Sequence, residues 1–347
     1  MTNIQEIFLK FKKEQKELEG ATLDSKVLIV DGLNQYMRCF AAFTTMDDNG
    51  EHIGGVVGLL MSLALTIRTL KPTRCVIVFD GRGGSQRRRE IFKEYKENRK
   101  SMTRLNRTYG FNSIEEEKKS QSWQLKLLVK ILEHLPVTMM ALDQVEADDI
   151  IAYLAELNYS RGNKTIILST DKDFLQLVND KTTVYNPVKK REYDEQTVLD
   201  EYFIHPKNFL VYRSMDGDKS DGIPGVKGVG VKTLIKHFPR LLGSNLVTIE
   251  EIFKEAEQID AKVCKSIVEN EELIERNSKL MQLRDVDISG TIKLKALDMF
   301  DKKDVQQLNK FELTKLLRDT KLLGAIKNYD HWVLDAWGIL NRYTLCR

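Results

Sequence analysis

KVLIVDG, residues 26–32, is a short run of aliphatic residues that ends in Asp-Gly. A short apolar run closed by a turn signal is typical of a strand buried on both faces of a parallel sheet. Comparable runs recur at residues 71–81, 136–143, 164–171 and 182–188, with helical patterns between most of them. Strands that alternate with helices predict an α/β fold with a mainly parallel sheet and flanking helices.

The pattern changes along the chain and predicts its organisation. After about residue 191 the strand signals fade and short helical patterns follow. We expect an amphipathic helical extension at 1–24, an α/β domain at 25–193 with a charged insertion at 81–120, a helical domain at 194–290 and a helical extension at 291–347.

Bulk composition excludes several classes of protein. The chain has 347 residues, of which 42% are hydrophobic, and no apolar run of about 18 residues that could span a membrane. Its N-terminus is charged and lacks the apolar core of a signal peptide. Four cysteines lie far apart without a CxxC pair, which argues against a disulfide framework or a zinc site. We therefore expect a protein of the reducing cytoplasm.

Carboxylates cluster at the ends of the apolar runs. Because strand ends of an open α/β sheet meet at one edge, where ligands bind, we expect these side chains to lie together. Two like charges about 4 Å apart cost roughly 4 kcal/mol at an effective dielectric of 20. Bound divalent cations would relieve this repulsion, and oxygen-only ligands favour magnesium or manganese. The candidate ligands are Asp31, Asp80, Glu146, Asp148, Asp149, Asp171, Asp173, Asp218 and Asp221.

Each carboxylate also has a simpler interpretation. A single aspartate after a strand is a common helix N-cap, and acids in a first helical turn are favoured by the helix dipole. The joint occurrence of all nine favours metal binding instead. Two ions about 3.5–4 Å apart can support phosphodiester hydrolysis. No His–Ser–Asp arrangement competes, because the five histidines lie in unrelated contexts.

Two further segments indicate nucleic acid. Residues 82–107 carry ten Lys/Arg against three Glu, interleaved with aromatic residues, which suits single-stranded backbone and stacked bases better than a solvated surface helix. Residues 222–238, GIPGVKGVGVKTLIKHF, place glycines and two lysines before a helix. This is a helix–hairpin–helix signature that holds duplex backbone without reading bases. The alternative, a nucleotide-binding loop, is met only in part, since GVGVKT lacks the full P-loop pattern.

Six motifs occur in a characteristic order: LIVDG, VFDG, RRRE…YKENR, EADD, STDKDF and GDKSDGIPGVKGVG. This set resembles the 5′-nuclease family of flap endonucleases, phage 5′–3′ exonucleases with RNase H activity and the N-terminal nuclease domain of bacterial DNA polymerase I. The likeness runs from about Lys26 to about Ile288. It implies a PIN-like nuclease fold with a helical arch and a helix–hairpin–helix module.

The resemblance also implies roles for single residues. One metal ion would be held by Asp31, Asp80, Glu146 and Asp148, and a second by Asp171, Asp173 and Asp218, with Asp149 and Asp221 acting through water. Catalytic contacts to the scissile phosphate would come from Arg88, Lys96 and Arg99. DNA contacts would come from Arg87, Arg89, Lys93, Tyr95, Gly225, Lys227, Gly228, Gly230 and Lys232. The implied ions are two or more Mg²⁺, with Mn²⁺ as a substitute, and K⁺ at the hairpin.

Two departures from the family pattern stand out. Bacterial members usually have SDNIPG where this chain has Ser220-Asp221-Gly222-Ile223-Pro224-Gly225, which puts the local turn in doubt. Residues after about 290 match nothing in the pattern, and no polymerase domain follows, as in phage-type enzymes.

The expected function is a structure-specific 5′ nuclease that cuts branched or nicked DNA and RNA primers in replication. Alternatives are an exonuclease or RNase H with little flap activity, a PIN-type ribonuclease, and a junction-binding protein without catalysis. Expected partners are DNA with a 5′ flap, nick or 5′ end, an RNA–DNA hybrid, and a replication clamp or single-strand-binding protein, with no membrane. The expected location is the cytoplasm, or the host cytoplasm for a phage-encoded protein.

Overall fold

The computed structural model describes residues 22–97, 106, 108–302 and 305–345. Most of the predicted N-terminal extension, and Arg99 within the predicted arch, lie outside these ranges. Every helix in the described ranges is too short or too polar to pass through a lipid bilayer.

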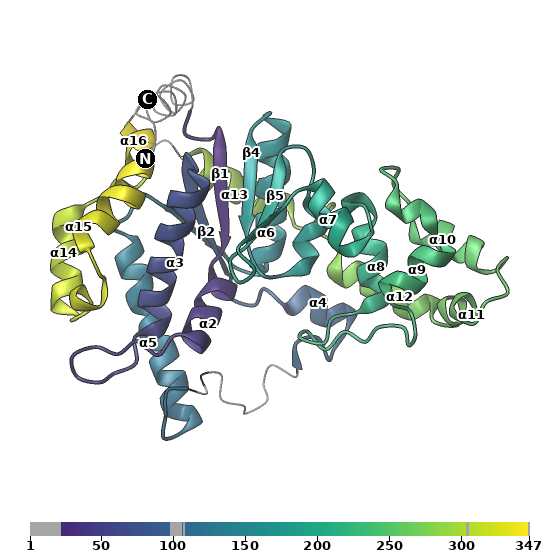
Figure 1. The fold of residues 1–347 in the computed structure, drawn as a ribbon, viewed down its shortest axis with the longest axis horizontal. Helices are drawn as coiled ribbons and strands as arrows, with labels where there is room; N and C mark the ends of the chain where they lie inside the picture. Colours follow the sequence, from purple (N-terminus) through teal and green to yellow (C-terminus); the bar gives the residue numbers. More distant parts are fainter. Residues whose placement is uncertain (1–21, 98–105, 107, 303–304, 346–347) are drawn as a thin grey trace, which may run out of the picture.

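A six-stranded sheet with strand order β3-β2-β1-β4-β5-β6 lies at the centre of the molecule (Figure 1). Strands β1 to β5 are parallel, and β6 pairs antiparallel with β5. The strands are β1 (Lys26–Asp31), β2 (Arg74–Asp80), β3 (Thr138–Leu142), β4 (Lys164–Leu168), β5 (Thr182–Asn186) and β6 (Arg191–Tyr193). The prediction of a mainly parallel α/β sheet is confirmed.

All five expected strands are present, but β6 was missed. This three-residue strand follows β5 through a tight connection, and its only buried side chain is Tyr193. A strand this short carries too little alternation to be recognised from the pattern of hydrophobic residues.

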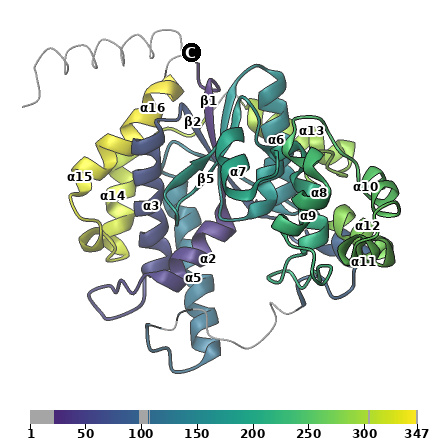
Figure 2. The ribbon, with the colours of Figure 1, turned by 45° about the vertical axis from the view of Figure 1, so that its right-hand side comes forward.

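Both faces of the sheet are covered, as the uniformly apolar strands require. In β1, Val27 and Ile29 belong to one core cluster, whereas Leu28 and Val30 belong to the other. Helix α6 (Ala147–Ser160) packs on the first face. The second face is covered by α2 (Gly32–Ala42), α3 (Gly54–Leu70) and α5 (Ile114–Leu132). Figure 2 shows these two layers on either side of the strands.

Helix α5 begins seven residues earlier than its apolar periodicity indicates. The sequence predicts a charged segment up to about Ser120, but the helix starts at Ile114. The Ser113 hydroxyl accepts a hydrogen bond from Glu116 N at 3.0 Å, and Glu115, Glu116 and Glu117 occupy the first turn. An N-cap and acids near the positive end of the dipole stabilise this polar first turn without an apolar face. Between Gly81 and Ser113, the described residues form one α-helix, the short α4 (Gln86–Ile91).

A helical region lies beside the sheet (Figure 1). Its α-helices are α7 (Glu195–Tyr202), α8 (Phe209–Asp216), α9 (Val231–His237), α10 (Ile249–Ala256), α11 (Lys262–Glu269) and α12 (Glu271–Met281). Phe209, Phe238 and Ile252 are fully buried and belong to the same core cluster as Val27 and Ile29 of β1. The helical region and the sheet therefore share one continuous apolar core.

The last helices return to the sheet instead of extending away from it. Helix α13 (Gly290–Asp301) contacts α6 and β3. Helices α14 (Lys310–Asp319), α15 (Tyr329–Trp332) and α16 (Gly338–Leu345), with the π-helical turn η6 (Val333–Trp337), lie over α3 and α5 (Figures 1 and 2). The domain limits expected from the sequence stay a prediction.

Candidate active site at the carboxyl edge of the sheet

The carboxyl ends of three adjacent strands carry three of the expected carboxylates. Asp31 is the last residue of β1, Asp80 is the last residue of β2, and Asp171 follows β4 by three residues. Asp31 accepts hydrogen bonds from Asn34 N at 3.1 Å and from the Ser169 hydroxyl at 3.1 Å. It therefore caps α2 and also ties the end of β1 to the end of β4.

The N-terminus of α6 brings three more carboxylates to this edge. Asp80 Oδ1 accepts a hydrogen bond from Ala147 N at 2.8 Å, so the end of β2 holds the first turn of α6. Glu146 precedes that turn, and Asp148 and Asp149 lie in it. The N-cap interpretation is thus correct for Asp31, whereas Asp80 is not an N-cap and supports α6 from the neighbouring strand.

Arg88 of α4 is buried among the carboxylates at the start of α6. Its Nη1 donates to Glu146 Oε2 at 2.6 Å and to Asp149 Oδ2 at 2.8 Å, while Nη2 donates to Asp149 Oδ1 at 2.8 Å. Its Nε donates to the Leu280 carbonyl at 2.8 Å. These contacts raise the pKa of Arg88 despite its burial, so it stays charged. In this structure Arg88 orders the carboxylates and does not face solvent.

Tyr95 and Lys96 also converge on Glu146. The Tyr95 hydroxyl donates to Glu146 Oε2 at 3.1 Å, and Lys96 Nζ lies 2.8 Å from Glu146 Oε1. Burial alone would raise the pKa of Glu146, but the positive charges of Arg88 and Lys96 have the larger effect. The pKa of Glu146 is therefore lower than its ordinary value. Tyr95 is only 3% exposed, so this structure does not present it for the DNA contact that the resemblance implies.

The segment after β4 and the helical region together contribute the second half of the cluster. Asp171 Oδ1 accepts a hydrogen bond from Asp173 N at 2.8 Å and caps the short helix η2 (Lys172–Leu177). Asp218 follows α8 and lies near Asp173 because Arg213 of α8 bridges the two, with its Nε 2.5 Å from Asp173 Oδ1 and its Nη2 2.6 Å from Asp218 Oδ2.

The turn at Asp218–Ile223 forms despite the departure from the family pattern. Asp218 and Ile223 exchange two backbone hydrogen bonds, at 2.8 and 2.7 Å, and Gly222 has φ +74°. Glycine and asparagine are the residues that best tolerate positive φ, so Gly222 can replace the usual asparagine. At Gly225 a Cβ would lie 2.1 Å from the Asp216 carbonyl oxygen, so this position has room only for glycine.

Mutual repulsion and burial mark three carboxylates that the arginines do not neutralise. Burial raises the pKa of Asp31 to about 7, and Asp171 and Asp80 add to this increase. Burial and Asp173 raise the pKa of Asp171 to about 7. The pKa of Asp148 is raised by burial and by Asp31 and Asp171. Among the described residues, no lysine or arginine forms an ion pair with these three aspartates.

The donor chemistry of this edge fits hard divalent cations. It consists of carboxylate oxygens from separate segments, and a bound cation would lower the raised pKa values of Asp31, Asp148 and Asp171. However, no three His, Cys, Asp or Glu side chains within the described ranges are arranged so that they could hold a metal ion as they stand. In the part of the chain that the structure describes, at least four of the nine expected ligands are instead paired with arginine or lysine. These are Glu146, Asp149, Asp173 and Asp218.

The expected DNA-binding residues differ in accessibility. Arg89, Lys93, Lys227 and Lys232 are exposed. Arg87 is partly buried and lies 3.4 Å from both Asp149 and Asp287. Gly225, Gly228 and Gly230 lie in the connection between α8 and α9, as the hairpin signature predicts, and Gly228 has φ +84°.

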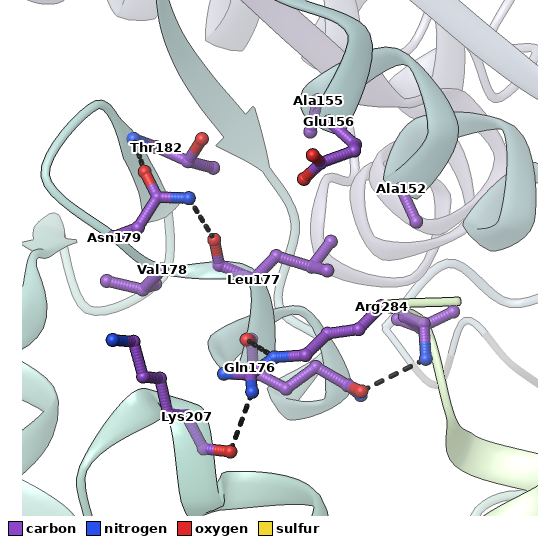
Figure 3. Close-up of a pocket in the computed structure, with 11 residues that line it drawn as sticks. Ala152, Ala155, Glu156, Gln176, Leu177, Val178, Asn179, Thr182, Lys207 and Arg284 are labelled. Atoms are coloured by element: carbon purple, nitrogen blue, oxygen red, sulfur yellow. Dashed lines mark hydrogen bonds between the residues drawn. The ribbon is translucent and has the colours of Figure 1, made fainter. Parts of the chain in front are cut away.

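A pocket of about 250 Å³ lies at the C-terminal end of η2, where Gln176 and Leu177 line it (Figure 3). Arg284 borders it and donates to the carbonyls of Gln176, at 2.9 Å, and Lys207, at 2.7 Å. The buried Gln176 side chain donates to the Asp173 and Met281 carbonyls and accepts from Leu283 N. These bonds fasten residues 281–284 to the helix that carries Asp173.

Three buried or partly buried side chains at this site were not predicted from the sequence: Arg213, Gln176 and Arg284. Only Arg213 carries a local signal, because in a helix it lies three residues before Asp216 and five before Asp218. Gln176 and Arg284 are distant in the chain and act through main-chain carbonyls, which no side-chain pattern reveals.

The chain matches two adjoining family models: the N-terminal resolvase-like domain of 5′–3′ exonucleases at residues 26–203, and their C-terminal SAM fold at residues 204–304. The chain belongs to the 5′–3′ exonuclease family. This confirms the resemblance drawn from the six motifs and the prediction of a 5′ nuclease. A helix–hairpin–helix also fits the SAM-like second part of this family.

Similar proteins support this membership. A 5′–3′ exonuclease of Buchnera aphidicola is 32% identical over 225 residues, which are 63% of this chain and 73% of that protein. A 5′–3′ exonuclease of Aquifex aeolicus is 29% identical over 293 residues, 84% of this chain and 93% of that protein. The bacteriophage T5 flap endonuclease, solved with DNA and metal ions, superposes with a TM-score of 0.60 at 21% identity and covers 84% of this chain and 98% of that one. The T5 structure supports the fold.

Proposed function

We propose that this protein is a divalent-metal-dependent, structure-specific 5′ nuclease that hydrolyses phosphodiesters in DNA with a 5′ flap, a nick or a free 5′ end. One observation carries the proposal. Carboxylates from three strand ends, from the start of α6 and from the loop after α8 influence one another electrostatically at a single edge of the sheet. Family membership and the DNA and metal ions of the T5 relative support the same chemistry.

The site divides into two groups of candidate ligands. Asp31, Asp80, Glu146 and Asp148 surround the start of α6, whereas Asp171, Asp173 and Asp218 lie between η2 and α8. Divalent cations bound there would lower the pKa of the attacking water and stabilise charge on the leaving oxygen. Asp149, which is held by Arg88, and Asp221, whose N–H contacts Asp218 Oδ1 at 3.3 Å, are proposed to act through water.

The basic side chains are proposed to position the nucleic acid. Lys96 lies beside Glu146, next to the first group of carboxylates, where its charge can approach a phosphate. Arg88 supports that group from behind, and Arg99 lies outside the described residues. Lys227 and Lys232 are exposed in the hairpin and at the start of α9, and they would hold duplex backbone.

Two finer proposals concern substrate and ions. A flap endonuclease and an exonuclease or RNase H are both compatible with these features. The relative rates at which the protein cleaves a flap, a nicked duplex and an RNA–DNA hybrid would distinguish the two. Magnesium is proposed as the natural ion, with manganese as a substitute. The K⁺ ion at the hairpin, the clamp or single-strand-binding partner and the cytoplasmic location stay predictions from the sequence.

One observation favours a second candidate, a junction-binding protein without catalysis. Four expected ligands are held in ion pairs with arginine or lysine, and a protein that never binds metal would keep them so. The three aspartates with raised pKa values argue against this alternative, because uncompensated carboxylates at one site cost stability.

Cleavage of labelled substrates separates the two candidates. With Mg²⁺ the wild-type protein should cut a 5′-labelled flap, nicked duplex or RNA–DNA hybrid, and a chelator should stop the reaction. Asp148→Asn should lower the cleavage rate more than about 100-fold, beyond the usual effect of losing a group that only supports a metal ligand. Because this change removes a negative charge, DNA binding measured without metal should not weaken.

A matched control uses Asp143, which follows β3 at the same edge, is exposed and accepts a hydrogen bond from Arg82 N. Asp143→Asn should leave the cleavage rate near that of the wild type. Cleavage that persists in chelator, or an Asp148→Asn variant as active as the control, would reject the metal mechanism. Tight junction binding without any cleavage would establish the second candidate.

A further inference from the structure

Arg213 is a buried arginine that links the helical region to η2 through four polar contacts. Its side chain is 4% exposed, and it extends from the last turn of α8 toward η2. Its Nη1 donates to the Gly217 carbonyl at 2.8 Å and lies 3.2 Å from Asp216 Oδ2, so the guanidinium is anchored to the end of its own helix. An anchored, planar group of this kind has little freedom to follow its partners and instead sets their positions.

The other N–H groups of this guanidinium, on Nε and Nη2, contact carboxylates from different parts of the chain. Nε lies 2.5 Å from Asp173 Oδ1 and Nη2 lies 2.6 Å from Asp218 Oδ2. Asp173 belongs to η2, which follows a strand, whereas Asp218 follows α8. Burial raises the pKa of Asp173 and the Asp218 carboxylate adds to this increase, so without the Arg213 guanidinium between them the two aspartates would repel each other.

The hydrogen bonds from Arg213 occupy one oxygen of each aspartate and leave Oδ2 of Asp173 without a bond from this arginine. Asp218 Oδ1 is held by Ser220 N at 2.7 Å and by the Ser220 hydroxyl at 2.6 Å, so both oxygens of Asp218 have fixed directions. Asp173 is held through Oδ1, and within the described residues no hydrogen bond is made to its Oδ2. Arg213 therefore orients both carboxylates and keeps Asp173 Oδ2 available for a cation.

We propose that Arg213 is a positioning residue of the second cation group: it sets the spacing and direction of the Asp173 and Asp218 carboxylates without touching the substrate. This inference rests on the proposed function. Hydrogen bonds to ligating carboxylates typically contribute 10–100-fold to metal affinity. The competing interpretation is that Arg213 is a counter-charge that occupies the place of a cation, in which case its removal would strengthen metal binding.

Manganese binding to the full chain, without nucleic acid, distinguishes these roles. Isothermal titration and the electron paramagnetic resonance signal of free Mn²⁺ both report binding independently of cleavage. For Arg213→Gln we expect one class of Mn²⁺ sites to weaken by about 10–100-fold, while the class assigned to Asp31, Asp80, Glu146 and Asp148 keeps its affinity. Unchanged or tighter binding in both classes would overturn the proposal.

Two further variants keep the test decisive. Arg213→Lys keeps the charge but cannot bridge two carboxylates, so it should recover folding stability without recovering the Mn²⁺ affinity. Full recovery by lysine would show that charge alone suffices and would overturn the positioning role. If Arg213→Gln does not fold, the lysine variant gives the answer.

Arg74 provides the matched control for loss of a buried arginine. It pairs with Asp24 at 2.7 Å and donates to the Phe300 carbonyl at 2.7 Å. It begins β2, whereas Asp80 ends that strand, so it lies roughly 20 Å from the carboxylates. Arg74→Gln should lower stability and leave both Mn²⁺ affinities unchanged. If the wild type binds no Mn²⁺, the proposed function fails as well; if it binds and Arg213→Gln binds equally, only this inference fails.

Discussion

At the scale of single residues, the same side chain often serves the fold and the candidate site. Asp31 caps α2 and also belongs to the carboxylate cluster, and Asp80 holds the first turn of α6. Arg88 and Arg213 each gather two carboxylates that would otherwise repel one another. Substitution at any of these positions therefore changes stability as well as chemistry, and activity alone cannot separate the two effects.

A buried histidine outside the site gives a prediction about pH. His52 Nε2 contacts the Phe43 carbonyl at 2.7 Å, and its Nδ1 accepts from Gln124 Nε2 at 3.0 Å. Gln124 Oε1 accepts from Gly55 N, which fixes the orientation of the amide. A neutral imidazole protonated on Nε2 satisfies both contacts, whereas a second proton on Nδ1 would face the amide donor. Burial accordingly lowers the pKa of His52 below its ordinary 6.5.

The sign of the pH effect follows from linkage. Between the lowered folded pKa and 6.5 the unfolded chain binds more protons, so the contribution of His52 to stability is complete above 6.5 and declines as the pH falls. The raised pKa values of Asp31 and Asp171 have the opposite effect on stability as the pH falls. The free energy of unfolding of the whole protein therefore depends on pH as the sum of these contributions. Urea unfolding of wild type and His52→Gln from pH about 7.5 to about 5.5 should isolate the histidine. The wild type should lose more stability; parallel curves would contradict the prediction.

At the scale of elements, the connection between α8 and α9 combines two tasks. Its first part, Asp218–Ile223, is closed by paired backbone hydrogen bonds and presents carboxylates. Its second part carries exposed Lys227 and, at the start of α9, exposed Lys232. Glycines with positive φ at 217, 222 and 228 allow the chain to reverse between these parts. The two parts should therefore respond to different substitutions.

The lysines of this hairpin are expected to control the salt dependence of duplex binding. Each phosphate contact contributes about −0.9 to the slope of log K against log salt, so Lys227→Ala with Lys232→Ala should reduce the slope by about 1.8. Fluorescence anisotropy in the presence of a chelator, so that no cleavage is expected, would measure this slope. Lys310→Ala with Lys315→Ala, on α14 at the other end of the molecule (Figure 1), is the control of equal charge. A slope equal to that of the control would reject the hairpin as a backbone contact.

At the scale of the whole molecule, the C-terminal helices complete the core of the sheet domain. Trp332, Val333 and Trp337 pack with α3 and α5, and the rings of the two tryptophans lie 5.5 Å apart in an edge-to-face arrangement. Helix α13 covers part of the other face. The segment that the family motifs do not reach is therefore a structural part of the protein.

Loss of this packing should be costly. Trp337 is fully buried, so Trp337→Ala should lower the free energy of unfolding by about 3–5 kcal/mol, measured by urea unfolding. Trp337→Phe keeps an aromatic ring and removes an Nε1–H that has no partner within the described residues, so it should cost less than about 1.5 kcal/mol. Phe311→Ala, at a side chain 75% exposed on α14, should stay within about 0.5 kcal/mol. Equal stability of Trp337→Ala and wild type would show that these helices do not support the core.

The sequence by itself determined the five parallel strands, the family and the edge at which the carboxylates gather. Each of these depends on local information: apolar runs, the residues that end them, and the rule that parallel strands finish at one edge. Gly222 could also replace the usual asparagine because positive φ is a property of the residue itself.

Only the tertiary structure decided how those residues are paired. It placed Arg88 against Glu146 and Asp149, buried Tyr95, joined Asp173 to Asp218 through Arg213, and folded the last helices over α3 and α5. These contacts join segments far apart in the chain. Their energies depend on burial and mutual distance, which periodicity and motif spacing do not contain.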